Sequence, residues 1–161
     1  NQKGRKKLGK YQIIPEKNIS KVKKVTNKLV NGVGGLKNNS IRIKIFKKFK
    51  KLGFKFPVLI SKHSIVSSQS KIGEGTIVLS QVYINSGAKI GKNCIINNKT
   101  LIEHDNVIGD HSHISTGVII NGNCNIGSET FIGSGSVLLN GIKIKRKAFI
   151  KIGTVVKKNI T

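Results

Sequence analysis

Residues 102–126 read IEHDNVIGDHSHISTGVIINGNCNI, and every sixth residue of this stretch is isoleucine. The same spacing continues in both directions, so that 17 successive positions at intervals of six are aliphatic. They are Ile60, Val66, Ile72, Val78, Ile84, Ile90, Ile96, Ile102, Ile108, Ile114, Ile120, Ile126, Ile132, Leu138, Ile144, Ile150 and Val156. The position four residues after each is usually small, and glycine recurs every 18 residues at Gly73, Gly91, Gly109 and Gly127. Three hexads therefore form one larger repeat.

A repeat of six residues predicts an all-β solenoid. An α-helix is excluded because a period of six does not keep one helical face buried. Each hexad instead makes a short strand and a corner, three hexads close one triangular coil, and the coils stack about 4.8 Å apart. The aliphatic residue fills the interior with the small residue beside it, and glycine permits the tight corner. Residues 58–161 are therefore expected to form a parallel β-helix of close to six coils.

The two cysteines, Cys94 and Cys124, both occupy the small inward position of their hexads. They are 30 residues apart, which is not a multiple of 18, so we expect them on different faces of the solenoid. Filling of the core is favoured over a metal site or a disulfide. So few cysteines also indicate a reducing compartment, and we expect the cytoplasm.

The charge of the chain is large and unevenly distributed. Its 161 residues include 30 Lys and Arg against 6 Asp and Glu, a formal net charge of +24. Of the basic residues, 17 lie in residues 1–53 and 7 in residues 143–158, whereas none lies between Lys99 and Lys143. A nucleic-acid partner is not favoured, because aromatic residues make up only 5% and no RNA-recognition or zinc-knuckle signature is present. The charge is interpreted as a solvated surface.

Two further features of the sequence limit the kind of protein it can be. No stretch approaches the roughly 20 apolar residues that span a bilayer, so no membrane partner is expected. The chain begins with Asn1 and contains no methionine, which leads us to expect a fragment of a longer protein.

The N-terminal part predicts one βαβ unit. Residues 28–31 are expected to form a short strand that runs into the glycine-rich turn at 32–35. A helix follows, capped by Asn39 or Ser40 and closed by Gly53, and residues 54–60 then extend into the first coil. The apolar stripe of this helix is expected to consist of Ile41, Ile45, Phe49 and Leu52. One such unit is too small for a domain, so residues 1–57 are interpreted as the end of a Rossmann-like domain and residues 58–161 as the solenoid domain.

The candidate chemistry lies where acidic residues and histidines interrupt the basic chain. His104 is followed directly by Asp105, a carboxylate that can orient an imidazole acting as a general base. Gly122 lies 18 residues further on, so its backbone N–H is expected about 5 Å from His104 along the solenoid axis. A base beside a free backbone donor suits acyl transfer, because one removes a proton and the other stabilises the oxyanion. Two alternatives stay open for His104, His111 and His113: a zinc site, or a structural role.

The hexads together with these residues resemble a known group of bacterial enzymes. The stretch from Ile102 to Gly117, followed by Gly122, is similar to hexapeptide-repeat acyltransferases of the sialic-acid O-acetyltransferase and nucleotide-amino-sugar N-acetyltransferase group. Residues 30–34, Arg42 and residues 53–57 also resemble the end of that group's sugar-nucleotide domain. The resemblance covers about residues 28–160.

This resemblance implies a left-handed β-helix, a homotrimer, and acetyl-CoA bound as co-substrate between two subunits, without a metal. It implies that His104 is the general base and that Asp105 raises its basicity. His113 and the Gly122 N–H would contact the acetyl carbonyl, Ser134 and Ile152 would line the coenzyme groove, and Gly34 would face the nucleotide sugar. The acceptor would be an amine or hydroxyl of a sugar or nucleotide-linked sugar.

Two interpretations of the basic residues remain. The cluster Lys143, Lys145, Arg146, Lys147 and Lys151 either meets the phosphates of CoA or is the solvated end of the solenoid. The whole chain is also consistent with a second function class, a non-catalytic solenoid that acts as a scaffold or binds polyanions through its charge.

Overall fold

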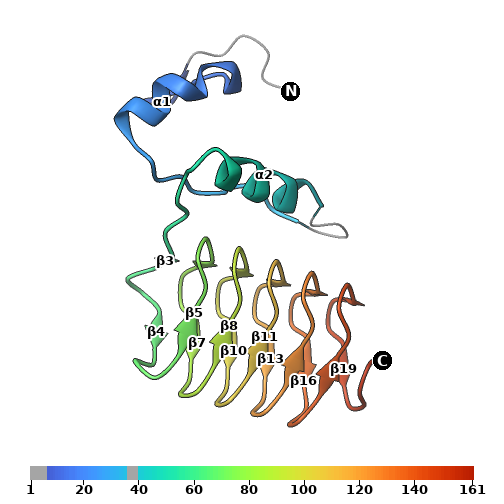
Figure 1. Ribbon diagram of the computed structural model, residues 1–161. Helices are drawn as coiled ribbons and strands as arrows, with labels where there is room; N and C mark the ends of the chain where they lie inside the picture. The colour runs from blue at the N-terminus through green and yellow to red at the C-terminus, as the bar shows by residue number, and fades with distance from the viewer. Residues whose placement is uncertain (1–6, 36–39) are drawn as a thin grey trace.

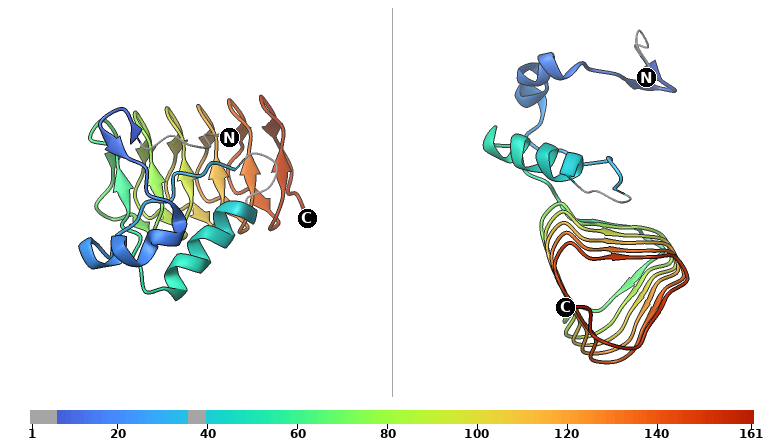
Figure 2. Two further views of the ribbon diagram at one scale, coloured as in Figure 1. Left: turned by 90° about the horizontal axis from the view of Figure 1, so that it is seen from above. Right: turned by 90° about the vertical axis from the view of Figure 1, so that its right-hand side faces the viewer.

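The computed structural model describes residues 7–35 and 40–161. Its main body is a solenoid of short strands stacked coil upon coil, with α2 lying across one side of the stack (Figure 1). Viewed along its axis, the solenoid has a triangular cross-section (Figure 2). The strands β3 to β19 form three parallel sheets of six, five and six strands. The predicted parallel β-helix is therefore confirmed.

Each sheet forms one face of the triangle. The face that lies partly beneath the N-terminal segment, here the covered face, consists of β3 (Leu59–Ile60), β6 (Ile77–Val78), β9 (Ile95–Ile96), β12 (His113–Ile114), β15 (Phe131–Ile132) and β18 (Phe149–Ile150). The apolar face consists of β4 (Ile65–Val66), β7 (Tyr83–Ile84), β10 (Leu101–Ile102), β13 (Ile119–Ile120), β16 (Val137–Leu138) and β19 (Val155–Val156). The basic face consists of β5 (Lys71–Ile72), β8 (Lys89–Ile90), β11 (Val107–Ile108), β14 (Asn125–Ile126) and β17 (Lys143–Ile144).

The register keeps residues 18 positions apart directly above one another. Ile102, for example, pairs with Ile84 on one side and with Ile120 on the other. The second residue of each strand points inward, and in the central coils these side chains are fully buried. At the first coil Ile60 is 48% exposed, because no preceding coil covers it. The hexad therefore places the core residues, and stacking buries them.

Both cysteines lie inside the solenoid as free thiols. Cys94 and Cys124 are almost completely buried, at two different corners of the triangle. Burial raises the pKa of the Cys94 thiol to about 12 and also raises that of Cys124. Both thiols are therefore protonated, and they fill the core.

The N-terminal part contains more structure than the sequence indicated. β1 (Lys7–Leu8) and β2 (Tyr11–Gln12) pair antiparallel, and a 3-10 turn at Glu16–Asn18 leads into α1 (Ile19–Val25). None of the residues of α1 is buried, which explains why the hydrophobic pattern did not reveal it.

The predicted βαβ pairing is present only as a single bridge. Lys28, which precedes α2 (Ser40–Lys51) in the chain, and Lys55, which follows it, form one isolated parallel bridge. The Leu29 N–H donates to the Lys55 carbonyl at 2.9 Å, but no strand forms over residues 28–31. Gly53 has φ +82°, the left-handed conformation expected after the helix. Whether this unit ends a Rossmann-like domain stays a prediction.

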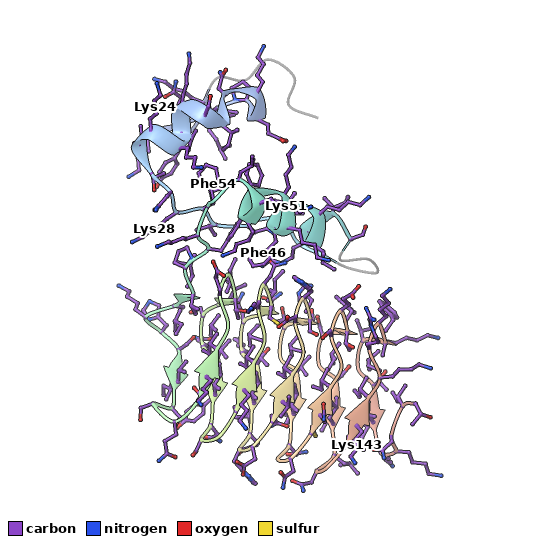
Figure 3. The ribbon with its side chains drawn as sticks, viewed as in Figure 1. Lys24, Lys28, Phe46, Lys51, Phe54 and Lys143 are labelled. Carbon is purple, nitrogen blue, oxygen red and sulfur yellow. The ribbon has the colours of Figure 1, made fainter. Side chains whose placement is uncertain are left out.

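The predicted apolar stripe of α2 was only partly right: Ile45 and Phe49 are half-buried, but Ile41 and Leu52 are exposed. The helix begins at Ser40, and the alternative cap Asn39 lies outside the described residues. Its buried side chains are Arg42 and Phe46, whereas Ile41 is 63% exposed. Phe46 lies on the side of α2 that faces the solenoid (Figure 3). The pattern misled because α2 sits on a corner rich in backbone carbonyls, where a guanidinium binds better than an aliphatic side chain.

Arg42 joins the N-terminal segment to the solenoid. Its Nε donates to the Asn93 carbonyl at 3.2 Å, and Nη2 lies 3.5 Å from the Cys94 carbonyl. Its Nη1 donates to the carbonyls of Asn31 and, at 2.9 Å, Val33. Burial lowers the pKa of this guanidinium, which nevertheless stays charged because Arg titrates far above neutrality. One buried side chain thus fixes residues 31–33 above the coils.

Candidate active site

The corner that joins the apolar face to the basic face holds His104, and we call residues 103–106 with their equivalents in other coils the His104 corner. His104 Nδ1 lies 3.0 Å from Asp105 Oδ2, and both side chains are more than half exposed. An ionised carboxylate only accepts hydrogen bonds, so Nδ1 carries the hydrogen and Nε2 keeps a free lone pair. This is the arrangement of a histidine ready to take a proton.

Gly122 occupies the same corner one coil further along the axis. The Asn123 N–H donates to the His104 carbonyl at 3.1 Å, which holds the two coils together. A Cβ on Gly122 would lie 2.6 Å from His104 Nε2, closer than real Cβ contacts allow. Among residues 7–35 and 40–161, no group accepts a hydrogen bond from the Gly122 N–H. The structure therefore brings together the two groups that the sequence paired, a free base and a free backbone donor.

Two residues that the sequence analysis did not single out shape this corner. A Cβ on Gly87, one coil before, would collide with Asp105 Oδ1, so glycine there makes room for the carboxylate. Asn106 is fully buried, donating to the Glu103 carbonyl at 2.7 Å and accepting from the Cys124 N–H at 2.8 Å. Both could have been found from the sequence, since Gly87 precedes Asp105 by 18 residues and Asn106 is a polar residue in the small inward position.

The next corner along the chain holds His111 in a different environment. We call residues 109–112 and their equivalents the His111 corner. The His111 ring packs edge-on against Phe46 of α2 at 5.8 Å, and its Nδ1 lies 3.0 Å from Asn93 Nδ2. Burial lowers the pKa of this half-buried histidine. His111 thus contributes to the attachment of α2.

His113 projects from β12 on the covered face and is nine-tenths buried beneath the N-terminal segment. Its Nδ1 hydrogen-bonds to the Gly35 carbonyl, so Nδ1 is the donor. Burial lowers the pKa of His113, and its Nε2 has no hydrogen-bond partner in the described part of the chain. His113 is therefore a neutral imidazole whose Nε2 is buried without a hydrogen-bond partner among the described residues.

A cavity of about 310 Å³ opens beside His113. Gly32, Val33 and Gly34 line one side of it, and Ile77 and Ile95 line part of the solenoid side. Gly34 has no atom within 4 Å of the position of a Cβ, so it faces open space. The sequence-predicted residues Gly34 and His113 thus share one cavity.

Ser134 and Ile152 lie on the third corner, between the covered and apolar faces. They stand one above the other as expected, since the Gly153 N–H donates to the Ser134 carbonyl at 2.8 Å. Ser134 Oγ lies 2.8 Å from Ser115 Oγ, and Ile152 is 77% exposed. Within one chain, the predicted site residues therefore fall on two corners and one face of the triangle, except Gly34, which lies in the N-terminal segment.

The basic cluster at the end of the solenoid is partly neutralised. Arg146 Nη2 lies 2.6 Å from Glu129 Oε1, and Lys147 Nζ lies 4.0 Å from the second oxygen of the same carboxylate. Over the part of the chain that the structure describes, no three His, Cys, Asp or Glu side chains gather as metal ligands. None of the described helices has the length and apolarity needed to traverse a bilayer.

The chain is similar to known proteins in its repeat sequence and in its fold. The family model described as the GMPPB C-terminal domain matches residues 60–161. No curated protein sequence matches the chain. Among solved structures, the acetyltransferase domain of PglB from Neisseria gonorrhoeae FA1090 in complex with acetyl coenzyme A is 25% identical, with a TM-score of 0.89 over 99% of this chain and 77% of that one.

Two further structures come from Caulobacter crescentus. PerB in complex with CoA and GDP-perosamine is 25% identical, with a TM-score of 0.88 over 95% of this chain and 73% of that one. A point mutant of perosamine N-acetyltransferase, also with CoA and GDP-perosamine, is 24% identical, with a TM-score of 0.89 over 97% and 73%. The fold match confirms the left-handed β-helix, and the match to acetyltransferases confirms the resemblance drawn from the sequence.

Proposed function

The chain belongs to the GMPPB C-terminal domain family, and from this premise we propose that it transfers an acetyl group from acetyl-CoA to an amine of a nucleotide-linked sugar. The similar structures support both substrates, because they hold acetyl-CoA, or CoA with GDP-perosamine. The observation that carries the proposal is the pairing, in an open corner, of His104 Nε2 with the Gly122 N–H, which has no acceptor in the described part of the chain.

This pairing fits the chemistry of direct acyl transfer. His104 Nε2 takes a proton from the attacking amine, while Asp105 holds the imidazole in the required tautomer through Nδ1. The Gly122 N–H donates to the acetyl carbonyl oxygen, where negative charge develops. Acetyl-CoA supplies the activated acetyl group, so the chain needs neither a covalent nucleophile nor a high-energy group of its own.

The cavity at Gly34 and His113 is assigned to the substrates. Gly32, Val33 and Gly34 on its loop side would face the nucleotide sugar, and His113 lines the same cavity. Ser134 and Ile152 are assigned to the coenzyme groove, as the resemblance implies. Residues 1–57 would then serve mainly the acceptor and residues 58–161 the acetyl donor.

The complete enzyme is proposed to be a homotrimer. Outward residues along the apolar face, among them Ile65, Tyr83, Ile119 and Val155, are exposed, whereas the basic face carries lysines at Lys71, Lys89 and Lys143. A continuous exposed apolar surface is typical of a subunit contact. The apolar face borders both the His104 corner and the corner of Ser134 and Ile152, so a second copy packed on it brings more groups to the site than one chain supplies. The activity is placed in the cytoplasm, where buried thiols stay reduced.

The proposal is tested by binding and turnover. Acetyl-CoA is titrated calorimetrically into the chain at physiological salt, with ATP and duplex DNA as controls, and acetylation of nucleotide-linked amino sugars such as GDP-perosamine is followed by mass spectrometry. We expect saturable binding of acetyl-CoA that neither control matches, together with an acetylated sugar. Equal binding of all polyanions, with no acetylated product from any acceptor, would indicate the scaffold function instead.

A further inference from the structure

One exposed side chain beside the proposed reaction centre has no role in the function described so far. Asn140 follows Gly122 by 18 residues, so it occupies the His104 corner one coil further along the axis. The Gly141 N–H donates to the Gly122 carbonyl at 2.9 Å, which fixes this coil against the preceding one. Asn140 is exposed, and no residue in the described ranges 7–35 and 40–161 hydrogen-bonds to its carboxamide.

The carboxamide points into the same small space as the proposed base. A Cβ placed on Gly122 would lie 2.6 Å from His104 Nε2 and 3.0 Å from Asn140 Oδ1. Because both atoms lie within 3.0 Å of one point, both border the space that a side chain of Gly122 would occupy. The absent side chain of Gly122 is what leaves this space open.

The two flanking atoms are both hydrogen-bond acceptors. His104 Nε2 has a lone pair because Nδ1 donates to Asp105, and Oδ1 of a carboxamide can only accept. A primary amine has two N–H groups and can satisfy both acceptors at once, whereas a hydroxyl has one hydrogen and leaves one acceptor unpaired. Sites built to receive a hydrogen bond discriminate strongly against a substrate that lacks the donor.

We propose that Asn140 determines specificity for an amine acceptor over a hydroxyl. This inference rests on the proposed function and names the residue that selects the amine. Asn140 Oδ1 accepts one N–H of the amine and aims the nitrogen lone pair at the acetyl carbon, while His104 Nε2 accepts the other N–H. The new C–N bond forms as the C–S bond breaks, and the proton taken by His104 passes to the departing CoA sulfur. Asn140 itself exchanges no proton.

The test compares two acceptors in three variants. Values of kcat/KM are measured with nucleotide-linked sugars that differ only in carrying an amino or a hydroxyl group at the acceptor position, using wild type, Asn140→Ala and Asn140→Asp. Where the hydroxyl sugar is not turned over, its inhibition constant replaces the rate. Leu139→Ala, a change at the exposed neighbouring residue, is the matched control. Thermal unfolding of each variant checks the fold.

We expect Asn140→Ala to lower kcat/KM for the amine about tenfold, the value of one hydrogen bond to a reacting group, with little effect on the hydroxyl sugar. Asn140→Asp, which keeps an oxygen acceptor of the same size, retains the preference for the amine, and so does Leu139→Ala. An active wild type whose preference survives in Asn140→Ala would overturn the role of Asn140 alone. A wild type that acetylates neither sugar would overturn the proposed function, and this inference with it.

Discussion

The His104 corner and the His111 corner are built from the same hexad, yet they differ in what they can do. Each holds a histidine beside an aspartate, Asp105 in one and Asp110 in the other. His104 is open to solvent with a free Nε2 beside Gly122, whereas His111 is packed against Phe46 and bonded to Asn93. The difference arises outside the repeat, because α2 covers only the second corner. Of these two histidines, the one that α2 leaves exposed is the candidate for the general base.

The strongest test of this comparison replaces each histidine by alanine. We expect His104→Ala to lower kcat by about 10²- to 10⁴-fold, the usual contribution of a positioned general base, with the unfolding midpoint close to that of wild type. His111→Ala should instead keep kcat and lose about 1 kcal/mol of unfolding free energy, because packing on Phe46 is lost. Steady-state kinetics and urea unfolding measure both effects. Equal loss of activity in the two variants, with both folded, would contradict the distinction.

A smaller effect is expected from a single added methyl group in the open corner. Gly122→Ala places a Cβ 2.6 Å from His104 Nε2, and the imidazole tip has to move. Displacing a reacting group by about 1 Å typically costs on the order of 10²-fold, so kcat should fall by about that factor while acetyl-CoA still binds. Steady-state kinetics measure kcat, and calorimetry measures the binding of acetyl-CoA.

Ser86→Ala is the control for this variant. Ser86 precedes His104 by 18 residues, so it lies one coil before His104 at the same corner, whereas Gly122 lies one coil after it. The substitution removes the side-chain oxygen and adds no atom. Its activity should match wild type. If Gly122→Ala were as active as this control, the close approach of His104 and Gly122 would have no catalytic meaning.

The mildest effect concerns the covered histidines and pH. Burial lowers the pKa of His111 and His113, so the folded state binds fewer protons than the unfolded state just below the ordinary histidine pKa of about 6.5. Stability is therefore complete above that pH and declines as pH falls through the depressed values. The urea midpoint, measured from about pH 7.5 to pH 5, should decrease with falling pH. Glu74, whose pKa is lowered by Lys50, contributes only at lower pH.

His113→Gln removes one of the two titrating histidines, so the urea midpoint of this variant should depend less on pH. The difference between the midpoints of the variant and wild type at neutral pH gives the stability lost through changed packing alone. A wild-type midpoint that stays constant or rises over the same range would show that these histidines are not held neutral by the fold.

The N-terminal part shows where sequence reasoning lost accuracy. Ile41 and Ile45 suggested the buried side of α2, but Ile41 is exposed and Ile45 is only half-buried. The fully buried side chains of the helix are Arg42 and Phe46. Helical periodicity identifies apolar residues without knowing what lies opposite them, and here the opposite surface offers carbonyls of Asn93 and Cys94. α1 was missed for a related reason, since a helix that buries no residue leaves no apolar pattern.

The sequence by itself determined the solenoid, its register and the juxtaposition of His104 with Gly122. A strict period of six and its threefold multiple of 18 leave one regular way to stack strands, so column neighbours follow from counting. Only the tertiary structure decided which histidines are covered, that His113 Nε2 has no partner among the described residues, and that Asn140 Oδ1 borders the same space as His104 Nε2. These depend on contacts between segments far apart in the chain and on side-chain directions, which no local period encodes.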